Sequence, residues 1–321
     1  MSDHLLQTAL DWHRAGRAVA VATVVETWGS APRGVGSLLI IDADGHMEGS
    51  VSGGCVEGAV IMEALDAIPS GDARLLDYGV SDDEAFAVGL ACGGRIRVLV
   101  EPVGGAMPVH LLEQLVAAIT ARQPIAYVTA AQAQACKLAH PADFPDRFRL
   151  DRSGFEEDGQ TFIAIHNPPL RMIVVGAVHI AQALLPMARA CGYDPVLIDP
   201  RGAFGSAERF PGETIIEDWP DEAMATLAPD TRTAVVTLTH DPKLDDPAII
   251  QTLKSQAFYL GCLGSTRTHA KRILRLTEAG FAEADIARIH APVGLDLGGR
   301  APAEIAVSIM AQVIATLRRA Q

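Results

Sequence analysis

The sequence predicts an α/β protein with two domains, an N-terminal mixed α/β domain and a C-terminal domain built on a doubly wound parallel sheet. Short apolar runs alternate with helix-length segments in the second half, which is typical of parallel strands joined by helical crossovers. A proline pair at 168–169 separates the halves, because proline can continue neither a sheet ladder nor a helix interior. A chain of 321 residues has the length expected for two domains, which we place at 1–167 and 168–321.

The N-terminal half is expected to mix helices with strands. Apolar residues at helical spacing predict a first helix that ends at Gly16. The Asp-Gly pair at 44–45 predicts a hairpin turn. Further helices are expected over 55–68 and 111–119. The expected strands are 19–27, 35–41, 47–51, 74–78, 95–101, 125–129 and 161–165.

The C-terminal half is expected to repeat a strand followed by a helix. The first helix is expected over 179–191, with either a kink at Pro186 or an earlier end to the helix. Pro302 suits the first turn of a last helix, whose apolar face runs through 305–317. The expected strands are 171–175, 195–198, 234–238 and 258–263.

The composition argues against several classes of partner and location. The net charge of -13 does not suggest the basic face of a nucleic-acid or anionic-membrane binder. No segment reaches the roughly 18 to 20 apolar residues needed to span a bilayer, and the first residues lack a signal-peptide pattern. The 5 cysteines are scattered and odd in number, which indicates a reducing compartment, so we expect a cytoplasmic protein. Three of them lie in apolar stretches and are expected to be buried: Cys136, Cys191 and Cys262.

Two cysteines stand beside paired glycines, one in Gly53-Gly54-Cys55 and the other in Cys92-Gly93-Gly94. Residues without side chains let a large ligand approach closely. Thiolates bind soft metals and attack electrophiles. The spacing of the two cysteines is unlike that of a closed zinc site. We therefore expect both cysteines and their glycines to contact a cofactor or metal, the alternative being inert buried thiols.

The loop over 26–36 carries Arg33 between small residues. A guanidinium in that setting can donate two parallel hydrogen bonds to an oxyanion, so Arg33 is a candidate binding residue. The alternative is an ordinary surface salt bridge.

The first turn of the C-terminal domain resembles a dinucleotide-binding fingerprint but departs from it. The turn reads Gly176-Ala177-Val178-His179, whereas the Rossmann fingerprint G-x-G-x-x-G has glycine at the position of Val178. A β-branched side chain there obstructs the approach of a pyrophosphate. Asp199 stands at about the distance expected for a ribose-binding acid. The domain is therefore expected to be Rossmann-like, with NAD(P) a doubtful ligand because of Val178.

The carboxyl ends of parallel strands meet along one edge, where ligands bind in such sheets. Ser265 and Arg267 open a helix there, and the N–H groups and positive end of a helix favour phosphate. The alternative is that Ser265 only caps the helix and Arg267 is solvated. The candidate binding residues at this edge are Gly176, His179, Asp199, Arg201, His240, Asp241, Ser265 and Arg267.

Several segments together resemble one family. The chain resembles the XdhC/CoxI family, accessory factors for xanthine dehydrogenase and related molybdenum hydroxylases. The resemblance covers nearly the whole chain and is least distinctive over 108–168. The segments that carry it are 26–36, 49–58, 91–94, 199–201, 239–241, 264–267 and 289–305.

The resemblance implies a chaperone for the molybdenum cofactor (molybdopterin) rather than an enzyme, with no catalytic residue assigned. Such a protein holds the cofactor, supports its sulfuration by a cysteine desulfurase partner, and inserts it into an apo molybdenum hydroxylase. By position, Cys55 and Cys92 match the family's glycine-rich cysteine motifs and are the candidate metal contacts. The resemblance also implies a homodimer.

Two other functions remain open from the sequence. One is an NAD(P)-dependent oxidoreductase that uses the C-terminal Rossmann-like cleft. The other is an adaptor that docks a hydroxylase without holding the cofactor.

Overall fold

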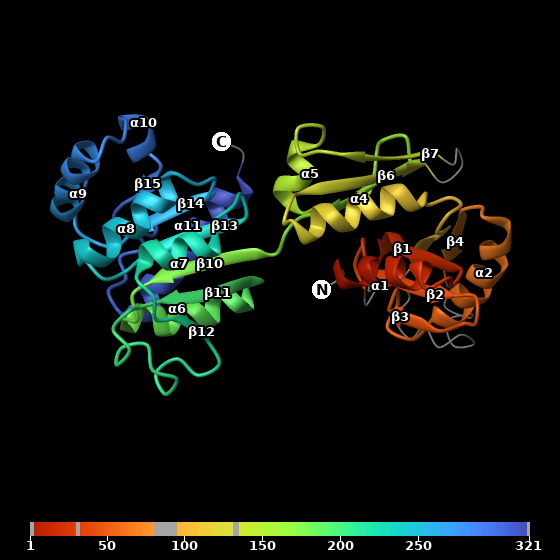
Figure 1. Ribbon diagram of the computed structural model, residues 1–321, viewed down its shortest axis with the longest axis horizontal. Helices are drawn as coiled ribbons and strands as arrows, with labels where there is room; N and C mark the ends of the chain where they lie inside the picture. Colours follow the sequence, from red (N-terminus) through yellow and green to blue (C-terminus); the bar gives the residue numbers. More distant parts are fainter. Residues whose placement is uncertain (1–2, 30–32, 80–94, 131–134, 320–321) are drawn as a thin grey trace. The chain divides into compact units, whose positions relative to one another are not determined.

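The computed structural model describes residues 3–29, 33–79, 95–130 and 135–319. The chain divides into two compact units, Met1–Pro168 and Pro169–Gln321. Figure 1 colours the first unit from red to yellow-green and the second from green to blue. Among the described helices, none is long and apolar enough to cross a lipid bilayer.

The N-terminal unit begins with a five-stranded antiparallel sheet in the order β3-β2-β1-β5-β4. Its central strand β1 is buried on both faces, because α2 packs on one face and α1 on the other. On the α2 face, Ala22 packs with Val60; on the α1 face, Val21 packs with Leu10. The elements are α1 (Asp3–Arg14), β1 (Val19–Trp28), β2 (Leu38–Asp42), β3 (Met47–Gly49), α2 (Glu57–Ser70), β4 (Arg74–Tyr78) and β5 (Arg95–Pro102).

A second antiparallel sheet, in the order β7-β6-β9-β8, completes this unit. A buried polar cluster joins the two sheets, because Tyr127 and Thr129 of β6 donate hydrogen bonds of 2.8 and 2.9 Å to Glu101 of β5. The elements are α4 (Val109–Thr120), β6 (Ile125–Ala130), β7 (Ala135–Ala139), α5 (Pro145–Leu150), β8 (Gly154–Phe155) and β9 (Thr161–His166).

The C-terminal unit is a six-stranded parallel sheet in the order β12-β11-β10-β13-β14-β15, with helices on both faces. Helices α6 and α11 share one core, and α7 and α8 share the other. The predicted doubly wound, Rossmann-like fold is therefore confirmed. The elements are β10 (Leu170–Val175), α6 (His179–Ala190), β11 (Tyr193–Ile198), β12 (Thr214–Ile216), α7 (Pro220–Leu227), β13 (Thr233–Thr237), α8 (Pro242–Leu253), β14 (Tyr259–Cys262), α9 (Thr266–Glu278), α10 (Glu283–Ile286), β15 (Ile289–His290) and α11 (Pro302–Arg318).

Some local predictions were wrong. The helix expected from residue 55 begins at Glu57, because the preceding residues turn around that carboxylate instead of continuing the helix. Cys191 is exposed at the end of α6, whereas Cys262 is buried as expected and Cys136 is half-buried. The alternative of a helix that ends before Pro186 is not observed, because Pro186 lies inside α6, which continues to Ala190.

Candidate functional site

The glycine-rich loop of the N-terminal unit is folded around the carboxylate of Glu57. The main-chain N–H groups of Gly53 and Gly54 donate to it at 3.0 and 2.9 Å, and so does Ser50 Oγ at 2.8 Å. Ser52 donates from its hydroxyl at 2.5 Å and from its N–H at 2.9 Å. Burial opposes ionisation of Glu57, but these hydrogen bonds outweigh it and lower the pKa to about 2. The loop therefore encloses a fixed negative charge.

The turn of the loop around Glu57 explains why two glycines stand next to each other, and it leaves the Cys55 side chain exposed. Gly53 and Gly54 have φ values of 80° and 115°, which a residue with a side chain rarely adopts. Ser52 Oγ accepts the N–H of Cys55 at 3.0 Å, and the Cys55 side chain is exposed. The second predicted cysteine motif, with Cys92 and Gly93, lies outside the described residues.

Arg33 lies beside the same loop. It lines a cavity of about 550 Å³ together with Gly49 and Ser50. Ser50 also donates to Glu57, so the cavity and the glycine-rich loop share a residue. The structure thus brings Arg33 to the start of the predicted motif.

The first turn of the C-terminal unit is closed by internal contacts. Asp199 accepts hydrogen bonds from the Ala177 N–H at 2.7 Å and from Arg201 Nε and Nη2 at 2.9 and 2.7 Å. Burial disfavours the Asp199 carboxylate, but these donors outweigh it and lower its pKa. A side chain on Gly176 would meet Thr239 Cγ2 at 2.5 Å, so the glycine serves the packing of β10 against the end of β13. His179 is exposed at the first position of α6.

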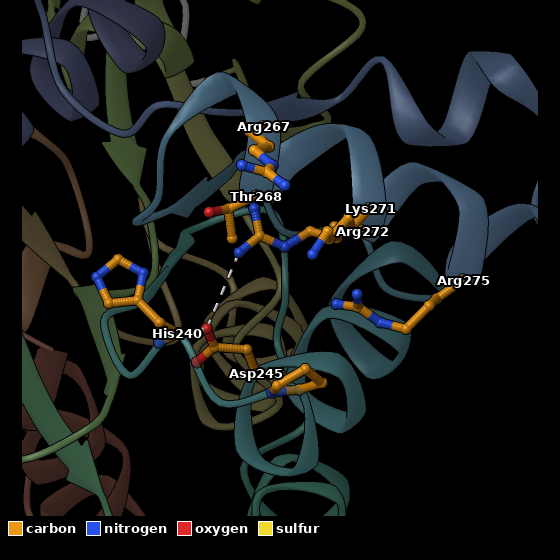
Figure 2. Close-up of a pocket in the computed structure, with 8 residues that line it drawn as sticks. His240, Asp245, Arg267, Thr268, Lys271, Arg272 and Arg275 are labelled. Carbon is orange, nitrogen blue, oxygen red and sulfur yellow. Dashed lines mark hydrogen bonds and ion pairs between the residues drawn. The ribbon is translucent and has the colours of Figure 1, made fainter.

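A basic pocket of about 250 Å³ lies at the carboxyl edge of the parallel sheet. Figure 2 shows Arg267, Lys271, Arg272 and Arg275 reaching it from α9, with His240 on the opposite side. The residues that line it are His240, Pro242, Asp245, Arg267, Thr268, Lys271, Arg272 and Arg275. Two of the predicted residues, His240 and Arg267, are therefore brought together here.

At the pocket, Asp245 and Arg272 face each other, and each side chain is only 2% exposed. Arg272 Nη2 lies 3.9 Å from Asp245 Oδ2 and donates to the Leu263 carbonyl at 3.1 Å. Asp245 also accepts from Thr239 Oγ1 at 2.6 Å and from the His240 N–H at 3.1 Å. Burial raises the pKa of Asp245, although these hydrogen bonds and the Arg272 charge act in the opposite direction.

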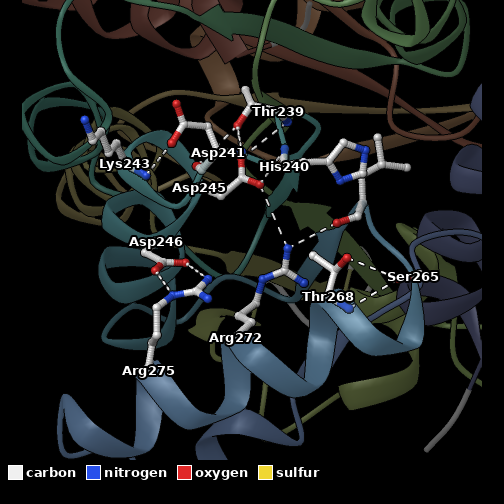
Figure 3. Close-up of polar contacts among 11 residues, drawn as sticks. Thr239, His240, Asp241, Lys243, Asp245, Asp246, Ser265, Thr268, Arg272 and Arg275 are labelled. Atoms are coloured by element: carbon white, nitrogen blue, oxygen red, sulfur yellow. Dashed lines mark hydrogen bonds and ion pairs between the residues drawn. The ribbon is translucent and has the colours of Figure 1, made fainter.

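Two predicted ligand residues cap helices in the structure. Asp241 accepts the Lys243 N–H at 2.9 Å and caps α8, while Ser265 accepts the Thr268 N–H at 3.3 Å and caps α9 (Figure 3). Ser265 thus caps α9, and its contact with a ligand stays a prediction.

The sequence reasoning missed Asp245 and the roles of Glu57 and Arg272. For Arg272 a signal was present, because Thr268, Arg272 and Arg275 recur at the spacing of one helix face. Asp245 gave no comparable signal, since its importance depends on α8 and α9 lying side by side.

Comparison with known proteins identifies the family. The description "XdhC and CoxI family" matches residues 12–79, and "XdhC Rossmann domain" matches residues 172–313. The molybdenum cofactor insertion chaperone PaoD of Escherichia coli (strain K12) is 32% identical over 319 residues, which cover 97% of this chain and 88% of PaoD. The chain belongs to the XdhC and CoxI family.

Two further proteins are similar to this XdhC and CoxI family member along nearly its whole length. A probable xanthine dehydrogenase subunit of Bacillus subtilis (strain 168) is 26% identical over 315 residues, which cover 93% of each protein. A crystal structure of a xanthine dehydrogenase from Bacillus halodurans matches with a TM-score of 0.60 and 25% identity, covering 99% of this chain and 96% of that one.

Proposed function

We propose that this protein is a molybdenum-cofactor chaperone that holds the cofactor, supports its sulfuration and inserts it into a xanthine dehydrogenase-type molybdenum hydroxylase. The observation that carries the proposal is the similarity to the chaperone PaoD, which spans 97% of the chain. The proposed partners are the apo-hydroxylase and a cysteine desulfurase, and the proposed assembly is a homodimer.

The residues present suit the two chemically distinct parts of molybdopterin. The cofactor has an anionic phosphate and a dithiolene-bound metal centre with an exchangeable sulfur. The exposed thiol of Cys55 suits the soft metal end, and Cys92 is its proposed companion. Each unit offers positive charge of its own in a chain whose net charge is -13: Arg33 beside the glycine-rich loop of the N-terminal unit, and the basic pocket that includes Arg267 in the C-terminal unit. When bound, the cofactor supplies the metal chemistry, and the chain's own residues bind and shield it.

The direct test is the molybdenum and pterin content of freshly purified protein. Protein from cells that make the cofactor is expected to carry pterin, and protein from cells blocked in its synthesis is not. Absence of pterin in both preparations, with hydroxylase binding retained, contradicts the carrier and favours the adaptor.

The cysteine role needs its own variants. Replacing both Cys55 and Cys92 by serine is expected to lower pterin content. Cys191→Ser, which changes an exposed cysteine at the end of α6, is the matched control and should keep wild-type content. Full cofactor delivery by the double variant contradicts a role for the two thiols.

A further inference from the structure

Arg272 is a buried cation whose hydrogen-bonding capacity is only partly used. Its side chain is 2% exposed. Within the part of the chain that the structure describes, Nε and Nη1 have no hydrogen-bond partner, and Nη2 donates only to the Leu263 carbonyl. Arginine stays protonated in proteins, and a buried charge without good partners is strongly unfavourable. Such an arrangement indicates that a further anionic partner belongs in the pocket that Arg272 lines.

Asp245 does not fulfil that role by itself. Its oxygen lies 3.9 Å from Arg272 Nη2, which is longer than a hydrogen bond. The carboxylate is already occupied by Thr239 Oγ1 at 2.6 Å and by the His240 N–H at 3.1 Å. Its raised pKa, caused by burial, also indicates that its negative charge is poorly stabilised. Asp245 therefore orients Arg272 without satisfying it.

The other basic side chains define what the pocket can hold. Arg275 is neutralised, because its Nε and Nη2 donate to Asp246 at 2.5 and 2.9 Å (Figure 3). Arg267 and Lys271 line the pocket at exposed positions of α9, one turn apart. Together with Arg272 they provide an excess of positive charge at the N-terminal half of a 13-residue helix, whose dipole also favours an anion.

The turn before α9 and the size of the pocket also favour a single anionic group as its occupant. Gly264 has a φ of 135°, and a side chain there would lie 3.0 Å from Thr268 Cγ2 and 3.6 Å from His240 Nδ1. Glycine at this position thus leaves the space between Thr268 and His240 unfilled. The volume of about 250 Å³ lies below the roughly 300 to 1,000 Å³ typical of sites that enclose a whole ligand. The pocket accordingly suits one charged group of a larger molecule.

We propose that this pocket binds the terminal phosphate ester of the pterin cofactor and that Arg272 is its anchoring residue. The assignment rests on the proposed function for the identity of the ligand. In this assignment the groups that contact the phosphate are Arg272, Lys271 and Arg267, whereas Ser265 caps α9.

The test compares two arginines that line the same pocket on the same helix. Arg272→Gln is expected to weaken the binding of inorganic phosphate and of phenyl phosphate, measured by calorimetry, by roughly tenfold or more, because a charge-assisted donor is lost. Arg275→Gln is the matched control, since Arg275 is held by Asp246, and is expected to stay within about threefold of wild type. Equal phosphate affinity in wild type and in Arg272→Gln overturns the proposal.

A second variant covers the case in which Arg272→Gln does not fold. Changing the exposed Arg267 and Lys271 together to glutamine leaves the core untouched and is expected to weaken phosphate binding several-fold. Unchanged affinity in this double variant also overturns the proposal.

Pterin content separates this inference from the proposed function. Wild type with pterin and Arg272→Gln without it supports the assignment. Equal pterin in both overturns the assignment while the chaperone function stands. Wild type without pterin contradicts the chaperone function. If phosphate affinity still depends on Arg272 in that case, the pocket binds a phosphate ester other than the pterin, and 5′-AMP is the probe for such an ester.

Discussion

The carboxylate of Glu57 accepts hydrogen bonds from both the hydroxyl and the main-chain N–H of Ser52, at 2.5 and 2.9 Å. The same hydroxyl accepts the N–H groups of Cys55 and Val56 at 3.0 and 2.9 Å. Glu57 and Ser52 thus hold the loop by hydrogen bonds. The position of the exposed Cys55 thiol therefore depends on the Glu57 carboxylate, whether or not a ligand is bound.

Glu57→Gln should destabilise the N-terminal unit at neutral pH. The pKa of Glu57 is lowered to about 2, so its carboxylate contributes stability that is present above about pH 4.5 and is lost as pH falls toward 2. The expected loss is about 2 to 3 kcal/mol at pH 7, measured by urea unfolding, and it shrinks in the acid range. Glu63→Gln, on the same helix in an exposed ion pair with Arg74, is the control and should cost less than about 1 kcal/mol. A loss that does not vary with pH contradicts the account.

Glu101 should give the opposite pH dependence. Burial raises its pKa to about 7, although the hydrogen bonds from Tyr127 and Thr129 act against this. A raised carboxyl pKa means that its contribution is fully present below about pH 4.5 and is lost as pH rises through 7. Glu101→Gln should therefore remove the fall in thermal midpoint between about pH 5 and about pH 8. A midpoint that falls equally in wild type and variant contradicts this assignment.

The protein should not bind nicotinamide dinucleotides. Val178 stands where the fingerprint has glycine, and both oxygens of Asp199 are engaged by Arg201 and Ala177. Titration of NADH and NADPH by calorimetry is expected to show no binding at millimolar concentration. Micromolar affinity would instead favour the oxidoreductase.

The cysteines should differ in reactivity toward iodoacetamide. Cys262 is buried, and burial raises its pKa to about 11, so it should remain unlabelled in the folded protein. The exposed Cys55 and Cys191 should both react. Bound cofactor should protect Cys55 but leave Cys191 unchanged, as measured by mass spectrometry of labelled peptides. Equal labelling of Cys55 with and without cofactor would remove it from the binding site.

The general architecture of the C-terminal unit followed from local patterns. The strands there are short, mostly apolar runs, and their alternation with helices predicts parallel pairing. The predicted strand ends therefore bring His240 and Arg267 to one edge of the sheet, and both residues line the basic pocket there.

What escaped prediction depends on contacts between segments. The turn around Glu57 requires positive φ angles at Gly53 and Gly54, which the residue types alone do not specify, so the predicted helix begins two residues before the observed one. The pairing of Asp245 with Arg272 requires α8 and α9 to pack side by side. In the sequence alone, nothing distinguishes Asp245 from the other acidic residues. The sequence predicts Arg201 as a ligand residue, whereas in the structure its guanidinium donates two hydrogen bonds to Asp199.

Transfer of the cofactor tests the central claim most directly. Protein loaded with pterin is mixed with an apo-hydroxylase, the two are separated, and the pterin bound to each is measured together with hydroxylase activity. The account predicts that pterin leaves this protein and that activity rises in proportion. Loaded protein that retains its pterin while the hydroxylase stays inactive would contradict it.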